Sequence, residues 1–564
     1  MSDFDPADFT AGLRLGLLPG LGGPAANPKT GSRPAVGLAA LERQARTARD
    51  DPTALEALAN AQFAAGQVMN AFGTWNRRIA LGGVSAPVWA RIGAAMERQE
   101  EYVQALRCLE QSLALEENPE VRHRMGRCLF KLGRVDEALA CHRAAAEASD
   151  NLAAWLAVAT IIPGAPSATP QDILTARTTF ADKLAASPMA NRMTCTPRPR
   201  AARDRLRIGY VSSWLEKPNY MRPTWALVNN HDRSAVEVHL FSDAKQGAAM
   251  PGYAPHPGDA LHHTADLDNT ALAEAISAAD LDVLIDINAY STPERLGMFT
   301  RAPAPVCLAW QNHFGPSGLQ GFHGIIGDVV AVKPGEETGY TETVHRLPLS
   351  YLTFTVSHRA PPVADPPCLR AGHITFGSLC VMYKITPQVV DTWAEILRCV
   401  PGSRLLLANR TLESGENRDW LAQCFADRGI ARDRLTLEGG AKHYDYLGNY
   451  DRMDLALDAF PYNGGTTTVE ALWQGVPLLT FDGDRWAGRT SASLVMHTHL
   501  REFVAPSRAA MIAKAIDLAT APETPQRLKA LRHGMRSMLT QAPVCDGKAM
   551  ARAVEDLCRR LCAL

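Results

Sequence analysis

A glycine- and threonine-rich segment that follows an apolar run has the composition of a phosphate-binding turn. In DLALDAFPYNGGTTTVEALWQGVPLLTF (454–481), Gly464 and Gly465 separate the apolar run from three threonines. Glycines can adopt a positive φ and let a ligand approach the backbone closely. Thr466 and Thr467 are predicted to open a helix, and the N–H groups and dipole at a helix N-terminus bind phosphate. An ordinary turn with a threonine N-cap has the same sequence, so both interpretations stay open on local grounds.

Two polar residues flank this turn. Asn463 directly precedes the glycines, and Glu470 lies one helical turn after the first threonine. A carboxylate at that place can accept hydrogen bonds from ribose hydroxyls. If the turn binds a phosphate, Glu470 is placed to contact a ribose of the same ligand, and the ordinary turn stays the alternative.

Short apolar runs alternate with helix-length segments from residue 204 onwards. Such runs are typical of βαβ units and a parallel sheet. A Pro-rich stretch interrupts the alternation, which then resumes. We therefore predict two doubly wound α/β lobes, at 204–356 and 369–564, joined by a hinge at 357–368. The last helix is expected to pack as core or to bridge the lobes, and ligands of such sheets bind beyond the carboxyl ends of the strands.

The residues before these lobes contain an internal repeat. Ala59, Gly93 and Gly126 recur at spacings of 34 and 33 residues, and a second small position follows the same rhythm. A period near 34, with small residues where paired helices approach, is typical of tetratricopeptide repeats. We predict these repeats over 36–150. The repeats form either a groove for a peptide or partner protein, or a solenoid that only supports the rest.

Two further segments complete the predicted organisation. Residues 1–35 are rich in Gly, Pro and Ala and are expected to be flexible, and 151–203 are expected to be a helical linker. The first residues lack a basic and apolar leader, and the twelve cysteines show no CxxC pair. We therefore expect a cytoplasmic protein.

The overall charge and hydropathy exclude two classes of partner. Lys and Arg number 58 against 59 Asp and Glu, which gives a formal charge of −1. Without a positive field, binding to a nucleic-acid backbone is not expected. No window reaches about 18 consecutive apolar residues, so no membrane span is expected either.

Several motifs, in the same order along the chain, resemble the catalytic region of the O-GlcNAc transferase/SPINDLY family. They are RIGYVSS (207–213), the segment around MYKITP (376–407), NGGTTTVEALWQGVP (463–477) and DRWAGRTSASL (484–494). The preceding repeats also match the family's architecture. The resemblance implies a GT-B fold, a UDP-sugar donor and inverting transfer to Ser or Thr hydroxyls of proteins.

The resemblance also implies roles for individual residues. Lys384 matches the lysine that contacts the donor diphosphate, and a fixed ammonium group can stabilise a leaving UDP without a metal. Thr466 and Thr467 match the threonines that bind the donor phosphates, and Glu470 matches an acidic ribose contact. The DGD sequence at 482–484 aligns with a family loop that is not a metal site. We therefore expect no metal and no cofactor beyond the donor substrate.

Some positions depart from the animal members of the family. A histidine of those enzymes is replaced by Gly465, as in many bacterial relatives, which indicates a bacterial subfamily. Their glutamine before the YK pair is Val381 here. Their His-Pro-Thr-Ser-His segment is replaced by LEKPNYMRPTWAL (215–227), where Arg222 can clamp a phosphate or carboxylate but cannot act as a base.

Three more side chains are candidates for the site. His313 is expected to face the cleft, and His313 and His443 are the candidate bases, because a histidine titrates near neutral pH. A donor phosphate or a chain of waters is the alternative proton acceptor. Arg489 is expected either to face the donor or to form a salt bridge within its lobe.

These observations lead to one functional hypothesis and its rivals. We predict transfer of N-acetylglucosamine from UDP-GlcNAc to a protein hydroxyl, with the repeats delivering the acceptor polypeptide. The first rival is the same fold with another sugar donor or an asparagine acceptor. The second is a non-catalytic repeat scaffold whose transferase region has degenerated.

Overall fold

The computed structural model describes residues 35–194, 204–217 and 222–563, and the chain divides into two units, residues 1–128 and 129–564. Of the predicted N-terminal segment 1–35, only Ala35 lies within the described residues, where it begins α2. The linker prediction at 151–203 is described as far as residue 194.

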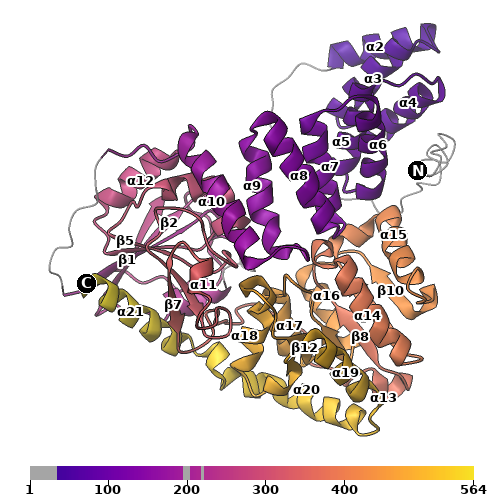
Figure 1. Cartoon of the computed structure of the whole chain (residues 1–564). Coiled ribbons are helices and arrows are strands. Elements are labelled where there is room, and N and C mark those ends of the chain that lie inside the picture. The colour runs from indigo at the N-terminus through magenta and orange to yellow at the C-terminus, as the bar shows by residue number, and fades with distance from the viewer. Residues whose placement is uncertain (1–34, 195–203, 218–221, 564) are drawn as a thin grey trace. The chain divides into compact units, whose positions relative to one another are not determined.

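The first unit consists of paired helices. Their bounds are α2 Ala35–Thr47, α3 Pro52–Ala64, α4 Val68–Ala80, α5 Ala86–Arg98, α6 Tyr102–Leu115 and α7 Pro119–Lys131, the last of which continues into the second unit. Helix α3 packs on α4, and α5 packs on α6 (Figure 1). Ala59, Ala71 and Ala105 are fully buried, and a Cβ added to Gly93 would lie 2.8 Å from Leu109. The small residues of the repeat therefore stand where helices meet, as the repeat pattern predicts.

Three helices predicted as repeat or linker belong to the second unit. They are α8 Val135–Ser149, α9 Leu152–Ile161 and α10 Pro170–Ala186, and the 3-10 turn η1 Ile162–Gly164 connects the last two. Thr169 caps α10 through a capping box with Asp172. Phe180 and Leu184 of α10 join the apolar core of the first lobe. The division into two units thus falls at residue 128, before the predicted boundary at 150, and α10 packs with the first lobe. The predicted bounds 36–150 and 151–203 stay a prediction.

The first lobe contains a parallel sheet of seven strands in the order β3-β2-β1-β4-β5-β6-β7. The strands are β1 Leu206–Ser212, β2 Val236–Ser242, β3 Ala260–His263, β4 Val283–Asp286, β5 Val306–Ala309, β6 Gly324–Asp328 and β7 Thr343–Leu347. Helices α11 Arg222–Val228 and α12 Asn269–Ala278 lie among them. Nearly continuous burial of β1, β2 and β4 agrees with a sheet covered on both faces.

The second lobe contains a parallel sheet of six strands in the order β10-β9-β8-β11-β12-β13. The strands are β8 Thr375–Ser378, β9 Arg404–Ala408, β10 Leu435–Glu438, β11 Leu455–Leu457, β12 Leu478–Phe481 and β13 Val504–Ala505. Its helices are α13 Cys368–Ala371, α14 Pro387–Cys399, α15 Gly415–Ala426, α16 His443–Gly448, α17 Thr466–Trp473, α18 Thr490–Met496, α19 Arg508–Thr520 and α20 Thr524–Thr540. Strand order reverses between β8 and β11, so the segments that follow these two strands meet at a topological switch point.

The last helix, α21 Gly547–Ala563, returns to the first lobe and packs on α11 and β7 (Figure 1). Met550, Val554 and Leu557 belong to the apolar core of that lobe. The last helix therefore packs in the core of the first lobe, although the range predicted for the second lobe, 369–564, includes it.

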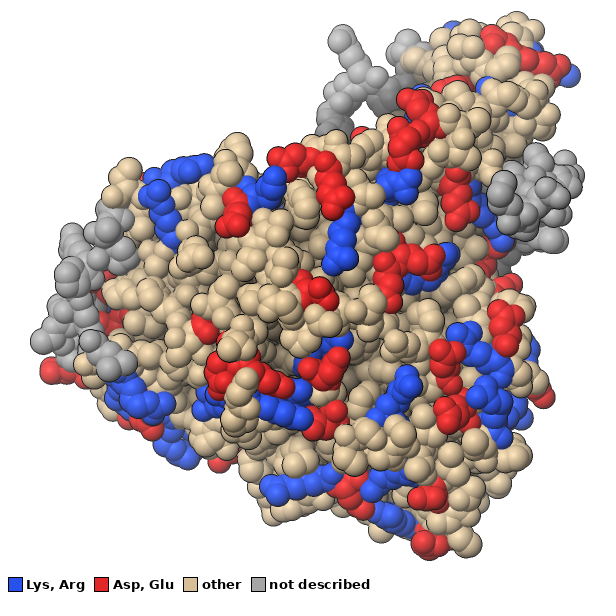
Figure 2. Space-filling model, in the orientation of Figure 1, with Lys and Arg blue, Asp and Glu red and all other residues tan. Residues whose placement is uncertain are grey.

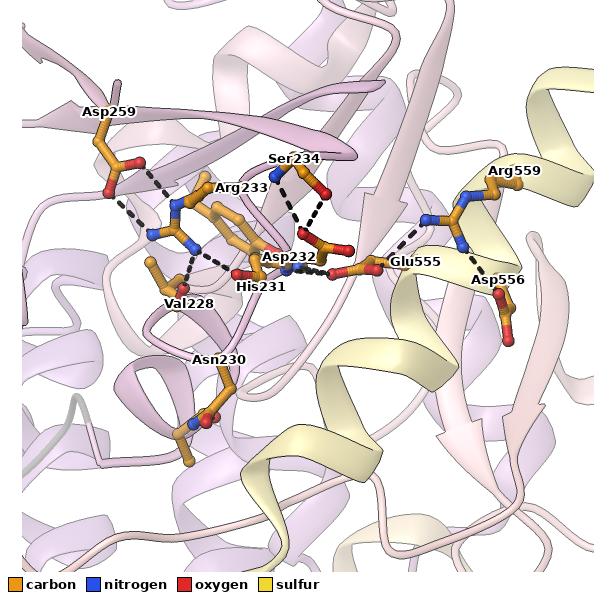
Figure 3. A network of polar contacts seen from close by, with 12 residues as sticks. Val228, Asn230, His231, Asp232, Arg233, Ser234, Asp259, Glu555, Asp556 and Arg559 are labelled. Atoms are coloured by element: carbon orange, nitrogen blue, oxygen red, sulfur yellow. Dashed lines mark hydrogen bonds and ion pairs between the residues drawn. The ribbon is translucent and has the colours of Figure 1, made fainter. Parts of the chain in front are cut away.

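Buried polar contacts also attach α21 to the first lobe. Glu555 accepts the backbone N–H of Asp232 at 3.0 Å, and its carboxylate lies 2.8 Å from Nδ1 of His231 (Figure 3). The other ring nitrogen of His231 hydrogen-bonds the Tyr210 hydroxyl at 2.6 Å. Burial lowers the pKa of His231, so the ring is neutral near pH 7. A satisfied polar network thus holds the end of the chain in place.

The surface carries both signs of charge. Lys and Arg alternate with Asp and Glu over the face shown in Figure 2. No helix of the described residues is long and apolar enough to cross a membrane.

Candidate functional site

The loop between β11 and α17 is fixed from within by a buried carboxylate. Asp458 directly follows β11 and accepts the backbone N–H of Gly464 at 3.0 Å and the hydroxyl of Thr480 at 2.8 Å. Burial raises the pKa of this carboxyl group, and its hydrogen bonds and Lys384 oppose that rise. Sequence reasoning missed Asp458, although a charged residue inside the apolar run DLALDAF is the signal that could have revealed it.

The two glycines have different structural roles. Neither has a positive φ, although glycine would permit one. A Cβ on Gly464 would lie 2.6 Å from the hydroxyl oxygens of both Thr467 and Thr468, so close packing requires glycine there. Gly465 precedes the helix with φ −133° and ψ −78°, and a Cβ there would meet its nearest neighbour at 3.8 Å.

Helix α17 begins as the sequence predicts. Thr466 is its first residue and is exposed, and Thr467 is half-buried. The hydroxyl of Thr468 pairs with that of Ser491 at 2.7 Å, and Ser491 donates to the carbonyl of Gly464 at 3.1 Å. The first turn of a helix leaves N–H groups without intrahelical partners. An anchored helix N-terminus is therefore presented at the switch point.

Lys384 approaches this loop from the other side of the switch point. It ends the 3-10 turn η5 Met382–Lys384, which follows β8. Its ammonium group donates to the carbonyl of Asn463 at 2.6 Å and lies 4.3 Å from the ring centroid of Tyr462. Burial lowers the pKa of Lys384 to about 8. The tertiary structure thus brings Lys384 and Asn463, 79 residues apart in the chain, into contact.

Glu470 and His443, predicted to have separate roles, form a pair. Glu470 is 5% exposed, and its Oε1 lies 2.8 Å from Nε2 of His443, the first residue of α16. The His443 ring also packs edge-on against His358 of the hinge, at a centroid distance of 4.7 Å. The pair stands beside the first turns of α17. Val381, the residue that precedes η5, is 42% exposed.

His313 does not face a cleft, so that expectation is wrong. The side chain is 0% exposed, and its Nε2 lies 3.1 Å from Asp286 at the end of β4. The rings of Tyr290 and Phe322 meet it edge-on. The backbone carbonyl of His313 accepts a hydrogen bond from Arg177, which fixes the loop with the histidine turned inward. Because no solvent reaches the ring, it has no path to an acceptor hydroxyl in this structure.

Arg489 does not face a donor either. Its guanidinium group is 4% exposed and binds both carboxylate oxygens of Glu336, at 2.7 and 2.9 Å. It also donates to the carbonyl of Gly483 at 2.6 Å. Nε of Arg489 also lies 3.5 Å from Asp482 of its own lobe. Arg489 therefore forms the salt bridge within its lobe that was the alternative, together with a closer one to Glu336 of the first lobe. Arg222 begins α11, and its side chain lies outside what the structure describes.

Metal ions in proteins are held by clusters of His, Cys, Asp and Glu side chains. Among residues 35–194, 204–217 and 222–563, no cluster of three or more His, Cys, Asp or Glu side chains could hold a metal ion. The positive elements of the site are the Lys384 ammonium group and the N-terminus of α17. Such elements stabilise a developing negative charge where water is partly excluded.

Known proteins resemble this chain along both units. The family model described as Glycosyl transferase family 41 matches residues 189–360 and 368–554, and a tetratricopeptide repeat model matches residues 98–161. A relative in Hordeum vulgare, named "Probable UDP-N-acetylglucosamine--peptide N-acetylglucosaminyltransferase SPINDLY", is 30% identical over 65% of this chain. The chain spans 39% of that relative's length.

A solved structure covers the repeats and the lobes together. A mutant O-GlcNAc transferase of Thermobaculum terrenum matches with a TM-score of 0.76 and 26% identity, over 95% of this chain and 99% of that one. An Arabidopsis thaliana relative named "Probable UDP-N-acetylglucosamine--peptide N-acetylglucosaminyltransferase SEC" is 26% identical over 62% of this chain and 36% of its own length. Since the family model matches more than half of the chain and spans both sheets, the protein belongs to glycosyl transferase family 41.

Proposed function

We propose that this protein transfers N-acetylglucosamine from UDP-GlcNAc to Ser or Thr hydroxyls of proteins. The observation that carries the proposal is the meeting of the Lys384 ammonium group with the 463–467 turn at the switch point of the second sheet. The names of the relatives and of the matching solved structure support the choice of donor and acceptor.

The site residues then have the following roles. The donor diphosphate lies on the N-terminus of α17, where Thr466 and Thr467 offer N–H groups and hydroxyls. Lys384 stabilises the negative charge that UDP develops as it leaves. Glu470, which is hydrogen-bonded to His443, accepts hydrogen bonds from the ribose hydroxyls. These groups supply the positive charge within the protein, so the proposed transfer uses neither a metal nor a cofactor.

The repeats are proposed to bind the acceptor polypeptide. A hollow of 310 Å³ lies on helices α5, α6 and α7. It is lined by Pro87, Ser112 and Asn118 and by charged residues of both signs. Such a mixed surface can pair with backbone and side chains of an extended peptide. We also propose a cytoplasmic location, because the cysteines within the described ranges are free thiols, as in a reducing compartment.

A donor screen tests this proposal. The protein is incubated with UDP- and GDP-sugars and with peptides that offer Ser, Thr or Asn, and released nucleotide and glycosylated peptide are measured. We expect transfer from UDP-GlcNAc to Ser or Thr, and a loss of at least about 100-fold in kcat for Lys384→Ala. The control is Lys548→Ala, which removes an exposed lysine of α21.

Each alternative gives a different result in this screen. Faster release from another nucleotide sugar, or transfer to Asn, would replace the donor or the acceptor in the proposal. Equal activity of the Lys384→Ala and Lys548→Ala proteins would refute the role of Lys384. No turnover of any donor, together with no rise of the thermal midpoint in millimolar UDP, would identify a scaffold without a nucleotide site.

A further inference from the structure

The aromatic face of Tyr462 is the second contact of the Lys384 ammonium group. Nζ lies 4.3 Å from the ring centroid, while the Asn463 carbonyl accepts its hydrogen bond. We propose that Tyr462 is a positioning residue that keeps Lys384 charged and aimed at the leaving diphosphate. This inference rests on the proposed function of Lys384 and assigns a role to a residue that the phosphate-binding pattern did not use.

An aromatic face suits this task for an electrostatic reason. The ring quadrupole attracts a cation within about 6 Å, and most strongly where water is excluded. A carboxylate partner would attract the lysine as well, but its full negative charge would also repel a diphosphate. The nearby carboxylate, Asp458, also attracts the ammonium group, but it accepts its hydrogen bonds from Gly464 and Thr480. The carbonyl and the ring therefore hold the ammonium group and leave its charge available to the substrate.

The Tyr462 ring is itself held from several directions. Gly164 of η1 lies against it, because a Cβ added there would stand 3.5 Å from the Tyr462 Cβ. Phe314 of the first lobe meets the ring edge-on at a centroid distance of 5.1 Å. Tyr383 lies 6.4 Å away and stacks at 4.7 Å on Phe130 of α7. Residues from η1, from the first lobe and from the second lobe thus surround the Tyr462 side chain.

Phe314 is fixed in turn by a buried arginine. Nη1 of Arg177 donates to the carbonyls of His313 and Pro316, at 2.7 and 2.6 Å, on either side of Phe314. The Arg177 guanidinium group is buried over the ring of Tyr290, 4.2 Å from its centroid. Phe314 has a φ of 51°, a conformation that a bulky residue rarely adopts without such restraint. The aromatic platform beneath Lys384 is therefore rigid.

Two substitutions at position 462 separate the ring from its hydroxyl. Tyr462→Phe keeps the ring face, and Tyr462→Leu keeps an apolar side chain without a π face. For each protein, kcat and KM for UDP-GlcNAc are measured. The fraction of Lys384 modified by acetic anhydride is then followed against pH by peptide mass spectrometry. The modification needs no donor and reports the protonation of this amine even in a protein that transfers no sugar.

We expect Tyr462→Phe to resemble the wild type within about twofold. Tyr462→Leu should lose roughly 2- to 30-fold in kcat, with a smaller change in KM, since a cation–π contact has that range of strength. Its Lys384 should also become reactive at a lower pH than in the wild type, because the charged form has lost a stabilising contact.

Two results would overturn the inference. One is a Lys384 modification profile of Tyr462→Leu that is unchanged or moved to higher pH. The other is an equal loss of activity in Tyr462→Phe and Tyr462→Leu, which would assign the effect to the hydroxyl or to packing. A wild-type protein that transfers no sugar from UDP-GlcNAc would refute the proposed function, and the modification profiles would still decide the contact between Tyr462 and Lys384.

Discussion

At the scale of single residues, the proposed site depends on one lysine in an unusual environment. An exposed lysine is charged far above neutral pH, whereas burial lowers the pKa of Lys384 to about 8. The charge of Lys384 is therefore sensitive to conditions close to neutral. The partly dry surroundings that lower its pKa also strengthen its attraction to a diphosphate.

The first prediction concerns the pH dependence of turnover. Lys384 must be protonated to stabilise the leaving group, and kcat/KM reports the pKa of the ligand-free protein. The kcat/KM for UDP-GlcNAc should therefore be level well below pH 8 and fall about tenfold per unit well above it. Initial rates of UDP release between about pH 6.5 and 9.5 measure this fall, which is the high-pH limb of the profile. Lys384→Arg should have a lower kcat but no such limb, because a guanidinium group stays charged. A wild-type profile that is flat to the upper end of the range would contradict the prediction.

At the scale of elements, the turn between β11 and α17 is tightly packed on one side and open on the other. Gly464 is enclosed by the hydroxyls of Thr467 and Thr468, and its N–H is bound to Asp458. Gly465, one residue later, is half-buried, and a Cβ added there would meet only Thr490 within 4 Å, at 3.8 Å. This difference agrees with a turn in which Gly464 is fixed by packing and Gly465 lies on the side that faces a ligand.

The second prediction compares these two glycines. Gly464→Ala places a Cβ 2.6 Å from two hydroxyl oxygens, so the turn must shift and UDP affinity should fall at least about tenfold, or about 1.4 kcal/mol. Gly465→Ala meets nothing closer than 3.8 Å and should stay within about twofold of the wild type. Calorimetric titration with UDP measures both. Equal affinities of the two variants would show that the turn does not bind the diphosphate.

At the scale of the whole molecule, polar contacts tie distant segments to the first lobe. Arg489 reaches across to Glu336, and Lys333 pairs with Asp482 at 2.5 Å. The last helix is held by Glu555, which is 3% exposed. A buried carboxylate destabilises the folded state unless its hydrogen-bond partners are present. Removing such a carboxylate also leaves its partners unsatisfied, so the free energy of unfolding should fall.

The third prediction concerns the last helix. Glu555→Ala leaves the N–H of Asp232 and the ring of His231 without their acceptor and should cost about 1–3 kcal/mol of stability. Asp556→Ala, on the same helix, removes an exposed partner of Arg559 and should change stability by less than about 0.5 kcal/mol (Figure 3). Thermal midpoints of the two variants measure the difference. Similar midpoints would mean that Glu555 does not anchor α21.

Much of this architecture follows from local sequence. Apolar runs such as VEVHLFS and SRLLLAN predicted strands because buried parallel strands need nearly continuous apolar residues. The spacing of Ala59 and Gly93 predicted paired helices because close helix contacts require small side chains. The start of α17 at Thr466 was also predictable, since glycines and hydroxyl residues mark a helix N-terminus. The resemblance to a family added Lys384.

Tertiary structure alone decided which of these side chains meet, because every such contact joins residues far apart in the chain. His313 turns inward since Arg177, 136 residues earlier, binds its carbonyl, and Arg489 finds Glu336 in the other lobe. The last helix belongs to the first lobe for the same reason. The sequence by itself determined that a turn such as 463–467 exists. Only the folded chain placed Lys384 and Tyr462 beside it, because strand order brings the ends of β8 and β11 together.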